Sequence, residues 1–146
     1  MELRVTLKIP ETVKNIEDSF SKELIELWED RKMSGKVFFY EEKKRPLSYI
    51  LVQENGYTNT IRGLYVIPEK RGKGLGTEMV DLVYSYYESL GATTMFVNIT
   101  EGAEKLYSNL GFTILGRRRD FTDQFVAFKG TLSGDDERSL RKKVAK

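Results

Sequence analysis

The chain has 146 residues, of which 40% are hydrophobic and 32% are charged, and its formal net charge at pH 7 is +2. This length and apolar fraction are typical of a single globular domain, and the small net charge does not demand a nucleic-acid partner. The chain contains no cysteine and no histidine. It therefore offers no disulfide bond, no Cys/His zinc site and no Cys or His nucleophile or base, and we expect no metal.

The first part of the chain predicts a strand followed by a long helical segment. Apolar residues alternate over residues 2–10, as in a strand, and this stretch lacks the apolar core of a signal peptide. Over residues 11–32 apolar residues recur every three or four positions, which predicts one helix, or two helices broken near residues 19–21. No apolar run reaches the roughly 18 residues of a membrane span, so we expect a cytoplasmic protein that makes no membrane contact.

Strand and helix patterns continue through the rest of the chain. Strands are predicted at residues 36–42, 47–53, 57–67, 93–100, 112–116 and 123–132. Helices are predicted at residues 75–90, with Gly91 as the C-terminal cap, and at residues 101–110. We interpret the charged residues 133–146 as a frayed helix or a solvated tail, so a single domain is expected over residues 1–132.

The most informative segment is a basic glycine loop, RGKGLG at residues 71–76, which joins a predicted strand to a predicted helix. Its glycines let the backbone approach an anion closely, and the helix N-terminus presents unpaired N–H groups. Lys70, Arg71 and Lys73 add positive charge, so the segment predicts a site for a phosphate-bearing ligand. The Walker loop and the dinucleotide fingerprint both need a glycine at the position of Thr77, so neither pattern fits.

A second motif lies downstream of the loop. The loop itself fits the pattern Arg/Gln-x-x-Gly-x-Gly/Ala through Arg71, Gly74 and Gly76. The pattern Ala-x-x-Leu-Tyr-x-x-x-Gly-Phe is met by Ala103, Leu106, Tyr107, Gly111 and Phe112. Thr100 stands where this second motif often begins with Asn. With both motifs at the expected separation, residues 61–112 resemble the GNAT superfamily of acetyl-CoA-dependent N-acetyltransferases.

The resemblance implies a fold class as well as a ligand. The expected GNAT fold is of the α/β (α+β) type, with a mixed and mostly antiparallel twisted sheet of about seven strands flanked by about four helices. The expected order of elements is β-αα-βββ-α-β-α-ββ, which agrees with the elements predicted along the chain.

The resemblance also implies roles for individual residues. The pyrophosphate of acetyl-CoA would bind to the loop backbone of Arg71, Gly72, Lys73, Gly74, Leu75, Gly76 and Thr77. The pantetheine arm would lie along Leu64, Tyr65 and Val66, with the Val66 N–H as an oxyanion-type contact. Thr100 would add a weaker contact to the cofactor. Tyr107 would protonate the departing sulfur, because a phenol of pKa about 10 can donate to the thiolate of a thiol of pKa about 8.5.

The general base is the least defined part of the site. Many family members carry a Glu on the strand before the loop, where this chain has Thr60 and Arg62. Glu54, in the predicted turn before that strand, is the nearest carboxylate in sequence. Proton transfer through water to Glu54 or to Asp120 and an acceptor of low pKa that needs no base are the alternatives.

The sequence therefore predicts direct transfer of an acetyl group from acetyl-CoA to a primary amine on a small molecule, peptide or protein. One alternative is a non-catalytic module that binds acyl-CoA, which the missing strand carboxylate favours. A second, less favoured alternative is a nucleic-acid-binding protein that uses the arginines at 117–119 and the basic residues at 138–146. The sequence does not predict the acceptor, the acyl length or whether the chain forms a homodimer.

Overall fold

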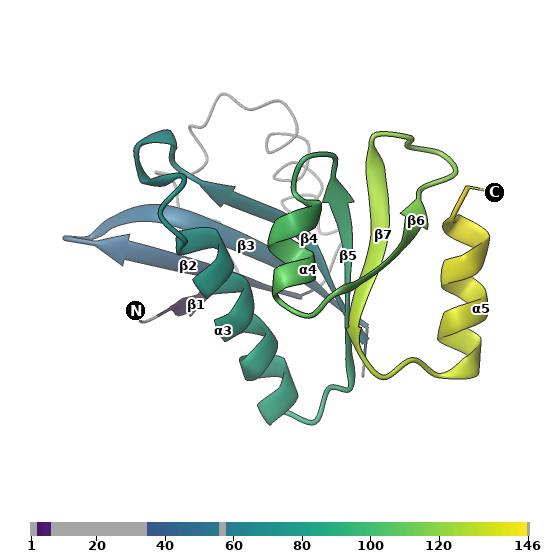
Figure 1. Ribbon diagram of the computed structural model, residues 1–146. Helices are drawn as coiled ribbons and strands as arrows, with labels where there is room; N and C mark the ends of the chain where they lie inside the picture. The colour runs from purple at the N-terminus through teal and green to yellow at the C-terminus, as the bar shows by residue number, and fades with distance from the viewer. Residues whose placement is uncertain (1–2, 7–34, 56–57, 146) are drawn as a thin grey trace.

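Seven described strands form one twisted sheet in the order β1-β2-β3-β4-β5-β7-β6 (Figure 1). They are β1 (Arg4–Thr6), β2 (Gly35–Glu42), β3 (Arg45–Asn55), β4 (Thr58–Val66), β5 (Thr94–Thr100), β6 (Thr113–Arg117) and β7 (Gln124–Gly130). Neighbouring strands are antiparallel except for β4 and β5, which are parallel. The computed structural model describes residues 3–6, 35–55 and 58–145. The predicted fold class, a mixed and mostly antiparallel sheet with helices, is confirmed.

Helices flank this sheet. They are the 3-10 helix η1 (Pro68–Lys70) and the α-helices α3 (Leu75–Ser89), α4 (Glu104–Asn109) and α5 (Gly134–Lys143). Helices α3 and α4 cover the same face of the sheet, whereas α5 lies beside β6 (Figure 1). The helical segment predicted at residues 11–32 lies outside the described residues. In the described parts of the chain, no helix is both long enough and apolar enough to cross a membrane.

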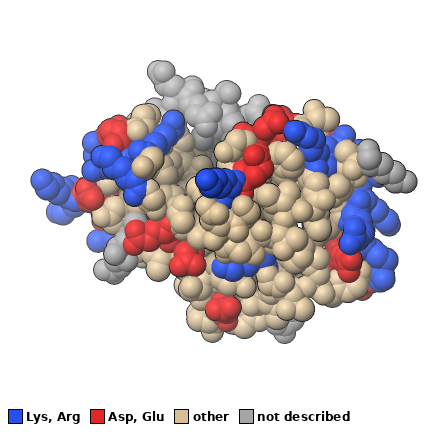
Figure 2. All heavy atoms as spheres, in the orientation of Figure 1, with Lys and Arg blue, Asp and Glu red and all other residues tan. Residues whose placement is uncertain are grey.

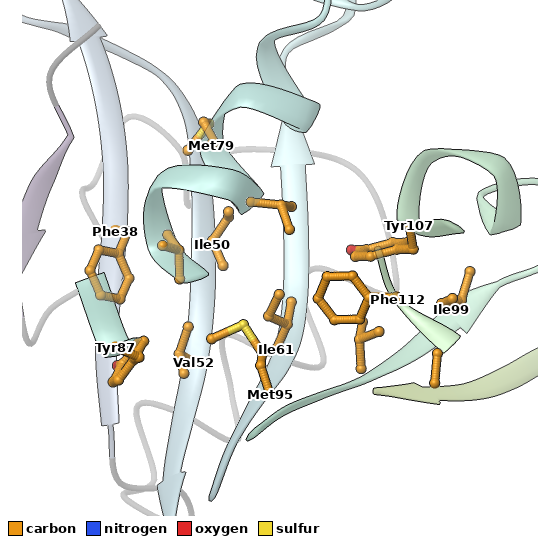
Figure 3. Packing of buried hydrophobic residues seen from close by; sticks show 14 residues of the cluster. Phe38, Ile50, Val52, Ile61, Met79, Tyr87, Met95, Ile99, Tyr107 and Phe112 are labelled. Carbon is orange, nitrogen blue, oxygen red and sulfur yellow. The ribbon is translucent and has the colours of Figure 1, made fainter. Parts of the chain in front are cut away.

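The main core lies between the sheet and helices α3 and α4 (Figure 3). Met79, Val80 and Val83 form the buried face of α3, and they pack against Ile50 and Val52 of β3. Side chains on a strand alternate between its two faces, so Tyr49 and Leu51 belong to a second buried cluster with Tyr65 on the opposite face. Full burial of one such apolar side chain stabilises the fold by about 1.5–3 kcal/mol.

The parallel pairing of β4 with β5 is short, and this opens the sheet. It runs from Thr58 opposite Thr94 to Ile61 opposite Val97, although both strands continue beyond that point. The pairing of β3 with β4 has a register shift at the same place, which leaves Arg62 as an extra residue in β4. Such a β-bulge bends its strand and increases the local twist. The two central strands therefore diverge after Ile61.

The charged C-terminal segment contains a capped helix. Ser133 caps α5 by accepting a hydrogen bond from the N–H of Asp136, and acidic and basic residues occupy the first and last turns, as the helix dipole favours. Leu140 is only 4% exposed. After the helix, the N–H of Ala145 donates to the carbonyl of Arg117 at 2.8 Å. Of the two interpretations offered from sequence, the structure therefore contains a helix, held against the edge of β6, and not a solvated tail.

Candidate active site

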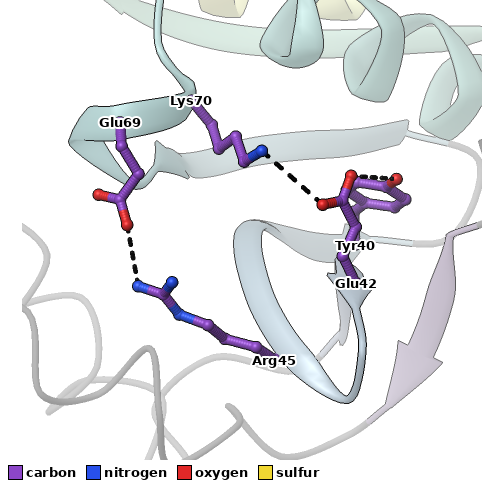
Figure 4. Close-up of polar contacts among 5 residues, drawn as sticks. All are labelled: Tyr40, Glu42, Arg45, Glu69 and Lys70. Carbon is purple, nitrogen blue, oxygen red and sulfur yellow. Dashed lines mark hydrogen bonds and ion pairs between the residues drawn. The ribbon is translucent and has the colours of Figure 1, made fainter.

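The glycine loop is anchored to the β2–β3 hairpin through η1, which precedes it (Figure 4). Nη2 of Arg45 lies 2.9 Å from Oε1 of Glu69, and Nζ of Lys70 lies 3.7 Å from Oε2 of Glu42. The hydroxyl of Tyr40 donates to the other oxygen of Glu42 at 3.0 Å. These contacts fix the start of the loop, and the ion pair with Glu42 neutralises part of the positive charge of Lys70.

The loop geometry leaves backbone donors at the start of α3. Gly72 and Gly74 have φ angles of 75° and 82°, in the left-handed region that glycine adopts without strain. Gly74 is the N-cap residue and has no side chain to cap the helix. The first intrahelical bond runs from the N–H of Glu78 to the carbonyl of Gly74 at 3.0 Å. The N–H groups of the three residues between them therefore have no partner within the helix.

Arg71 folds back from the loop onto the end of β4. Its Nε donates to the carbonyl oxygen of Val66 at 2.8 Å, and its guanidinium carbon lies 5.2 Å from the ring centroid of Tyr65. The Tyr65 ring in turn stacks on Tyr49, with centroids 5.9 Å apart and an interplanar angle of 19°. Arg71 is thus positioned by a strand end as well as by the loop.

A cavity of about 430 Å³, which we call the loop cavity, lies between the loop and the end of β4. Its lining residues are Leu64, Tyr65, Val66, Lys70, Arg71, Gly72, Gly74, Leu75, Gly76, Thr77 and Leu106. The structure therefore brings together most of the residues for which cofactor contacts were predicted. Lys73, which was also predicted, is exposed and does not line the cavity. Figure 2 shows the basic surface over this loop.

A second cavity of about 430 Å³, which we call the sheet cavity, lies where β4 and β5 diverge. Its lining residues are Tyr49, Ile61, Arg62, Gly63, Leu64, Val97, Asn98, Thr100, Ala103, Leu106, Tyr107, Asp123 and Gln124. The predicted residues Thr100 and Tyr107 are both among them. Leu64 and Leu106 line both cavities, so the two adjoin.

Tyr107 projects from α4 into the sheet cavity, with its hydroxyl directed toward β4 (Figure 3). The residue is 5% exposed, and its ring packs edge-on against Phe112 with centroids 5.4 Å apart. Burial raises the pKa of Tyr107 to about 12. The phenol therefore stays protonated at neutral pH. Because a thiol of pKa about 8.5 is a stronger acid, Tyr107 is better suited to donate a hydrogen bond to a leaving sulfur than to give up its proton fully.

Glu54 lies in β3 and not in the predicted turn, and it lines neither cavity. Its Oε2 accepts a hydrogen bond of 2.5 Å from Nζ of Lys36. Burial and then this same carboxylate raise the pKa of Tyr87. Glu54 pairs with Asn59 near the start of β4, and Val66 lies roughly 20 Å farther along that strand. The catalytic role expected for Glu54 therefore has no support in its position.

Asp120, the other carboxylate considered from the sequence, is paired within the protein. Its two carboxylate oxygens accept hydrogen bonds from Nε and Nη2 of Arg118 at 3.2 and 3.0 Å. Desolvation raises the pKa of Asp120, but hydrogen bonds and the nearby charge of Arg118 together lower it by more, so the pKa lies below its ordinary value. Asp120 lines neither cavity, so this alternative from the sequence is not favoured.

The sheet cavity contains polar residues that the sequence analysis did not assign to the site. Asn98 and Gln124 lie on the face of the sheet opposite α3, since their strand neighbours Ile99 and Phe125 pack into the main core. Asp123 directly precedes β7, and its backbone carbonyl accepts from the N–H of Glu101 at 2.8 Å. The pairing of Thr100 with Gln124 brings this segment to β5. Such a register is a long-range feature with no local sequence signal.

The arginines at 117–119 take part in local contacts. Arg117 pairs with Glu101 at 2.9 Å and lies over the ring of Phe125, while Arg118 pairs with Asp120. Acidic side chains are interspersed among the basic ones on the face shown in Figure 2. This arrangement does not favour the nucleic-acid-binding alternative. Within the described ranges, no three Asp or Glu side chains group as metal ligands.

Comparison with known proteins identifies the fold and the family. The family described as "acetyltransferase (GNAT) domain" matches residues 9–125. A search among curated proteins found no significant match.

Several solved structures share the fold at low sequence identity. A Bacillus subtilis acetyltransferase in complex with CoA has a TM-score of 0.72 and 15% identity, covering 89% of this chain and 98% of that one. The Escherichia coli ribosomal-protein-S18-alanine N-acetyltransferase has a TM-score of 0.66 and 16% identity, covering 92% and 98%. A variant of Vibrio cholerae spermidine N-acetyltransferase has a TM-score of 0.61 and 18% identity, covering 89% and 95%. These likenesses concern the fold and leave the acceptor open.

Proposed function

Because this chain belongs to the GNAT acetyltransferase family, we propose that it transfers an acetyl group from acetyl-CoA directly to a primary amine. The observation that carries this proposal is the junction of the two cavities. An anion-binding loop lies at one end, and a buried tyrosine that stays protonated lies in the other cavity. A cofactor whose pyrophosphate binds at the loop and whose pantetheine arm extends into the other cavity would place its thioester near Tyr107.

The loop cavity suits the pyrophosphate of acetyl-CoA. A Cβ atom added at Gly72 or Gly74 would meet nothing within 4 Å, so a ligand can approach the backbone there. The free N–H groups at the start of α3 and the charge of Arg71 favour an anion. In this proposal the loop residues 71–77 hold the pyrophosphate, with Lys73 contributing only its charge.

The end of β4 suits the pantetheine arm. The N–H of Ile67 bonds to the carbonyl of Leu47 on β3 at 2.9 Å. Because backbone groups of successive residues point to opposite sides of a strand, the N–H and carbonyl of Val66 point to the side that β5 has left. Arg71 reaches the Val66 carbonyl on that side. We assign the Val66 N–H as the donor to the thioester oxygen, and Leu64 and Tyr65 as neighbours of the arm.

The reaction removes one proton from the amine and releases CoA as a thiolate, which afterwards takes a proton from water. The amine nitrogen attacks the thioester carbonyl, so that the C–N bond forms as the C–S bond breaks. Tyr107 donates a hydrogen bond to the sulfur as negative charge develops there. We assign Asp123 as the acceptor of the amine proton, directly or through water. It lines the sheet cavity with Tyr107, and none of the described residues pairs with its carboxylate.

Calorimetry with acetyl-CoA and CoA tests the cofactor site. Gly74→Glu should abolish binding, since it places a side chain and a negative charge at the loop. Gly91→Glu is a matched control, because Gly91 has a similar φ of 89°, also lacks neighbours around a Cβ atom, and lies at the other end of α3. Absence of binding by the unmodified protein, or equal loss in both variants, would overturn the site.

An acceptor screen by thiol release then tests catalysis, and the cysteine-free chain gives no thiol background. Cofactor binding without turnover of any amine would instead support the alternative of a non-catalytic acyl-CoA-binding module. The cytoplasmic location stays a prediction from the sequence, which does not decide between a monomer and a homodimer.

A further inference from the structure

Arg62 is a half-buried charge without a counter-ion among the described residues. It occupies the bulge in β4 where β5 departs, and it lines the sheet cavity together with Tyr107 and Asp123. No described residue forms a hydrogen bond or an ion pair with its side chain. Burial and then the like charge of Arg118 lower the pKa of Arg62 below the ordinary arginine value. Arg62 therefore lines the cavity with a guanidinium group to which none of the described side chains or backbone groups bonds.

Arg118 is a comparably buried arginine whose side chain does have partners among the described residues. Its side chain is 20% exposed, and it pairs with Asp120. It also donates from Nη1 to Oε1 of Gln124 at 2.7 Å. Burial of a charge is costly unless partners satisfy it. Because none of the described residues supplies such partners to Arg62, we take its side chain as the group that meets a ligand in the sheet cavity.

The chemistry of Arg62 selects the kind of ligand. A guanidinium presents a planar fork of N–H donors that matches a carboxylate in a bidentate pair. The same group repels a second positive charge, and Arg118 adds to that repulsion. A polyamine is therefore disfavoured in this cavity. Asp123 offers the one carboxylate among the lining residues, which suits the amine end of a ligand.

Resting on the acetyl transfer proposed above, we infer that the acceptor is a small primary amine that also carries a carboxylate. Arg62 binds the carboxylate while the amine lies between Asp123 and Tyr107. The sheet cavity of about 430 Å³ has room for such a small molecule. Arg62 lies in the part of the strand where the resemblance predicts an acid. The inferred acceptor class therefore rests on a residue of this chain and not on a feature of the family.

Matched acceptors test the inference. Amino acids are compared with their carboxamides, which keep the amine and side chain but lack the negative charge, and with spermidine as a polycation. We expect kcat/KM to be roughly 10- to 100-fold higher for the carboxylates than for the carboxamides, the range of a charge-assisted hydrogen bond. The carboxamide has the less basic amine, so without a carboxylate site it would be the better acceptor.

Two variants of Arg62 identify the group responsible. Arg62→Gln should remove the preference for the carboxylate by raising its KM, whereas Arg62→Lys should keep part of it. Neither variant should change the affinity for acetyl-CoA, and neither should lower the melting temperature, since no described residue bonds to the side chain. A carboxylate preference that persists in Arg62→Gln would overturn the inference.

The remaining outcomes separate this inference from the proposed acetyl transfer. Equal or better turnover of carboxamides or spermidine would overturn the inference and leave acetyl transfer standing. If nothing is turned over, N-acetylated amino acids are titrated into the protein–CoA complex. Binding that Arg62→Gln abolishes would support the carboxylate site, and absence of binding would overturn it. Failure to bind CoA would overturn the proposed function itself.

Discussion

Nε of Arg71 donates a hydrogen bond of 2.8 Å to the carbonyl oxygen of Val66. This contact joins the glycine loop to the end of β4, so one side chain links the site proposed for the pyrophosphate to the strand proposed for the pantetheine arm. The Tyr65 ring lies beneath the guanidinium and limits its orientation. The position of the glycine loop is therefore coupled to the position of the end of β4.

Arg71→Ala should weaken the binding of acetyl-CoA by roughly 10- to 100-fold, because it removes a charged donor and the tether to β4. Calorimetry measures the effect. Lys73→Ala is the matched control, since Lys73 belongs to the same loop but does not line the cavity, and its screened charge should matter much less. A larger effect for Lys73→Ala than for Arg71→Ala would contradict the position assigned to Arg71.

Tyr107→Phe should lower kcat by roughly 100-fold, the scale of one donor lost from a developing negative charge. The dissociation constant of acetyl-CoA should change little, because the ring packing against Phe112 is kept. Tyr84→Phe provides a control on the half-buried face of α3, outside both cavities. Unchanged turnover in Tyr107→Phe would remove this residue from the mechanism.

The pH dependence gives a second test of Tyr107. Burial raises its pKa to about 12, so the phenol keeps its proton well above the ordinary value of about 10. Between these two pH values the phenol is still protonated in the folded protein and ionised in the unfolded chain, so stability falls as pH rises through this window. We expect kcat to show no loss centred near pH 10. A loss centred there that disappears in Tyr107→Phe would contradict the raised pKa.

Asp123→Asn should lower kcat by roughly 100-fold or more at neutral pH, because the amide cannot accept the amine proton. Acetyl-CoA affinity, measured by calorimetry, should remain. Asp120→Asn tests the neighbouring carboxylate, which is committed to Arg118 and lies outside the cavities, and its kcat should stay close to that of the unmodified protein. The reverse order of effects would move the base from Asp123 to Asp120.

Glu54→Gln should affect stability and not catalysis. Glu54 and Lys36 have side chains that are 30% and 28% exposed, so loss of their ion pair should cost about 1 kcal/mol and lower the melting temperature by about 3 °C. Lys36 keeps its position over the rings of Tyr86 and Tyr87, which limits the loss. Thermal unfolding and kcat are measured together. A loss of kcat of about 100-fold at unchanged stability would restore Glu54 as a base.

Local patterns in the sequence were sufficient to predict the strand, the loop and the helix that surround the loop cavity. Strand and helix patterns predicted β4 and α3 with ends that differ from the structure by at most one residue. The glycine spacing predicted the loop, whose left-handed residue Gly74 forms the N-cap of α3. These features depend on neighbours along the chain, which is why the residues around the loop cavity could be named in advance.

The acceptor side depends on long-range geometry that the sequence does not display. Glu54 precedes β4 in sequence, but β4 runs away from it, so the carboxylate lies at the opposite end of the strand from Val66. Asp123 reaches the cavity through the register between β5 and β7, and Arg62 through a bulge. Register and bulges are set by pairing between distant segments, and no local pattern encodes them.

The C-terminal helix offers a last prediction, on stability. Leu140 is 4% exposed, and it is the one buried residue of α5. Leu140→Ala should therefore destabilise the protein by about 2 kcal/mol, at the low end of the range for a buried leucine because α5 lies at the edge of the sheet. Urea unfolding measures this, with Ser139→Ala as an exposed neighbour in the same helix that should have little effect. If α5 were an independent tail, Leu140→Ala would leave the global unfolding midpoint unchanged. A shifted midpoint at constant m-value instead makes residues 133–145 part of the cooperative domain.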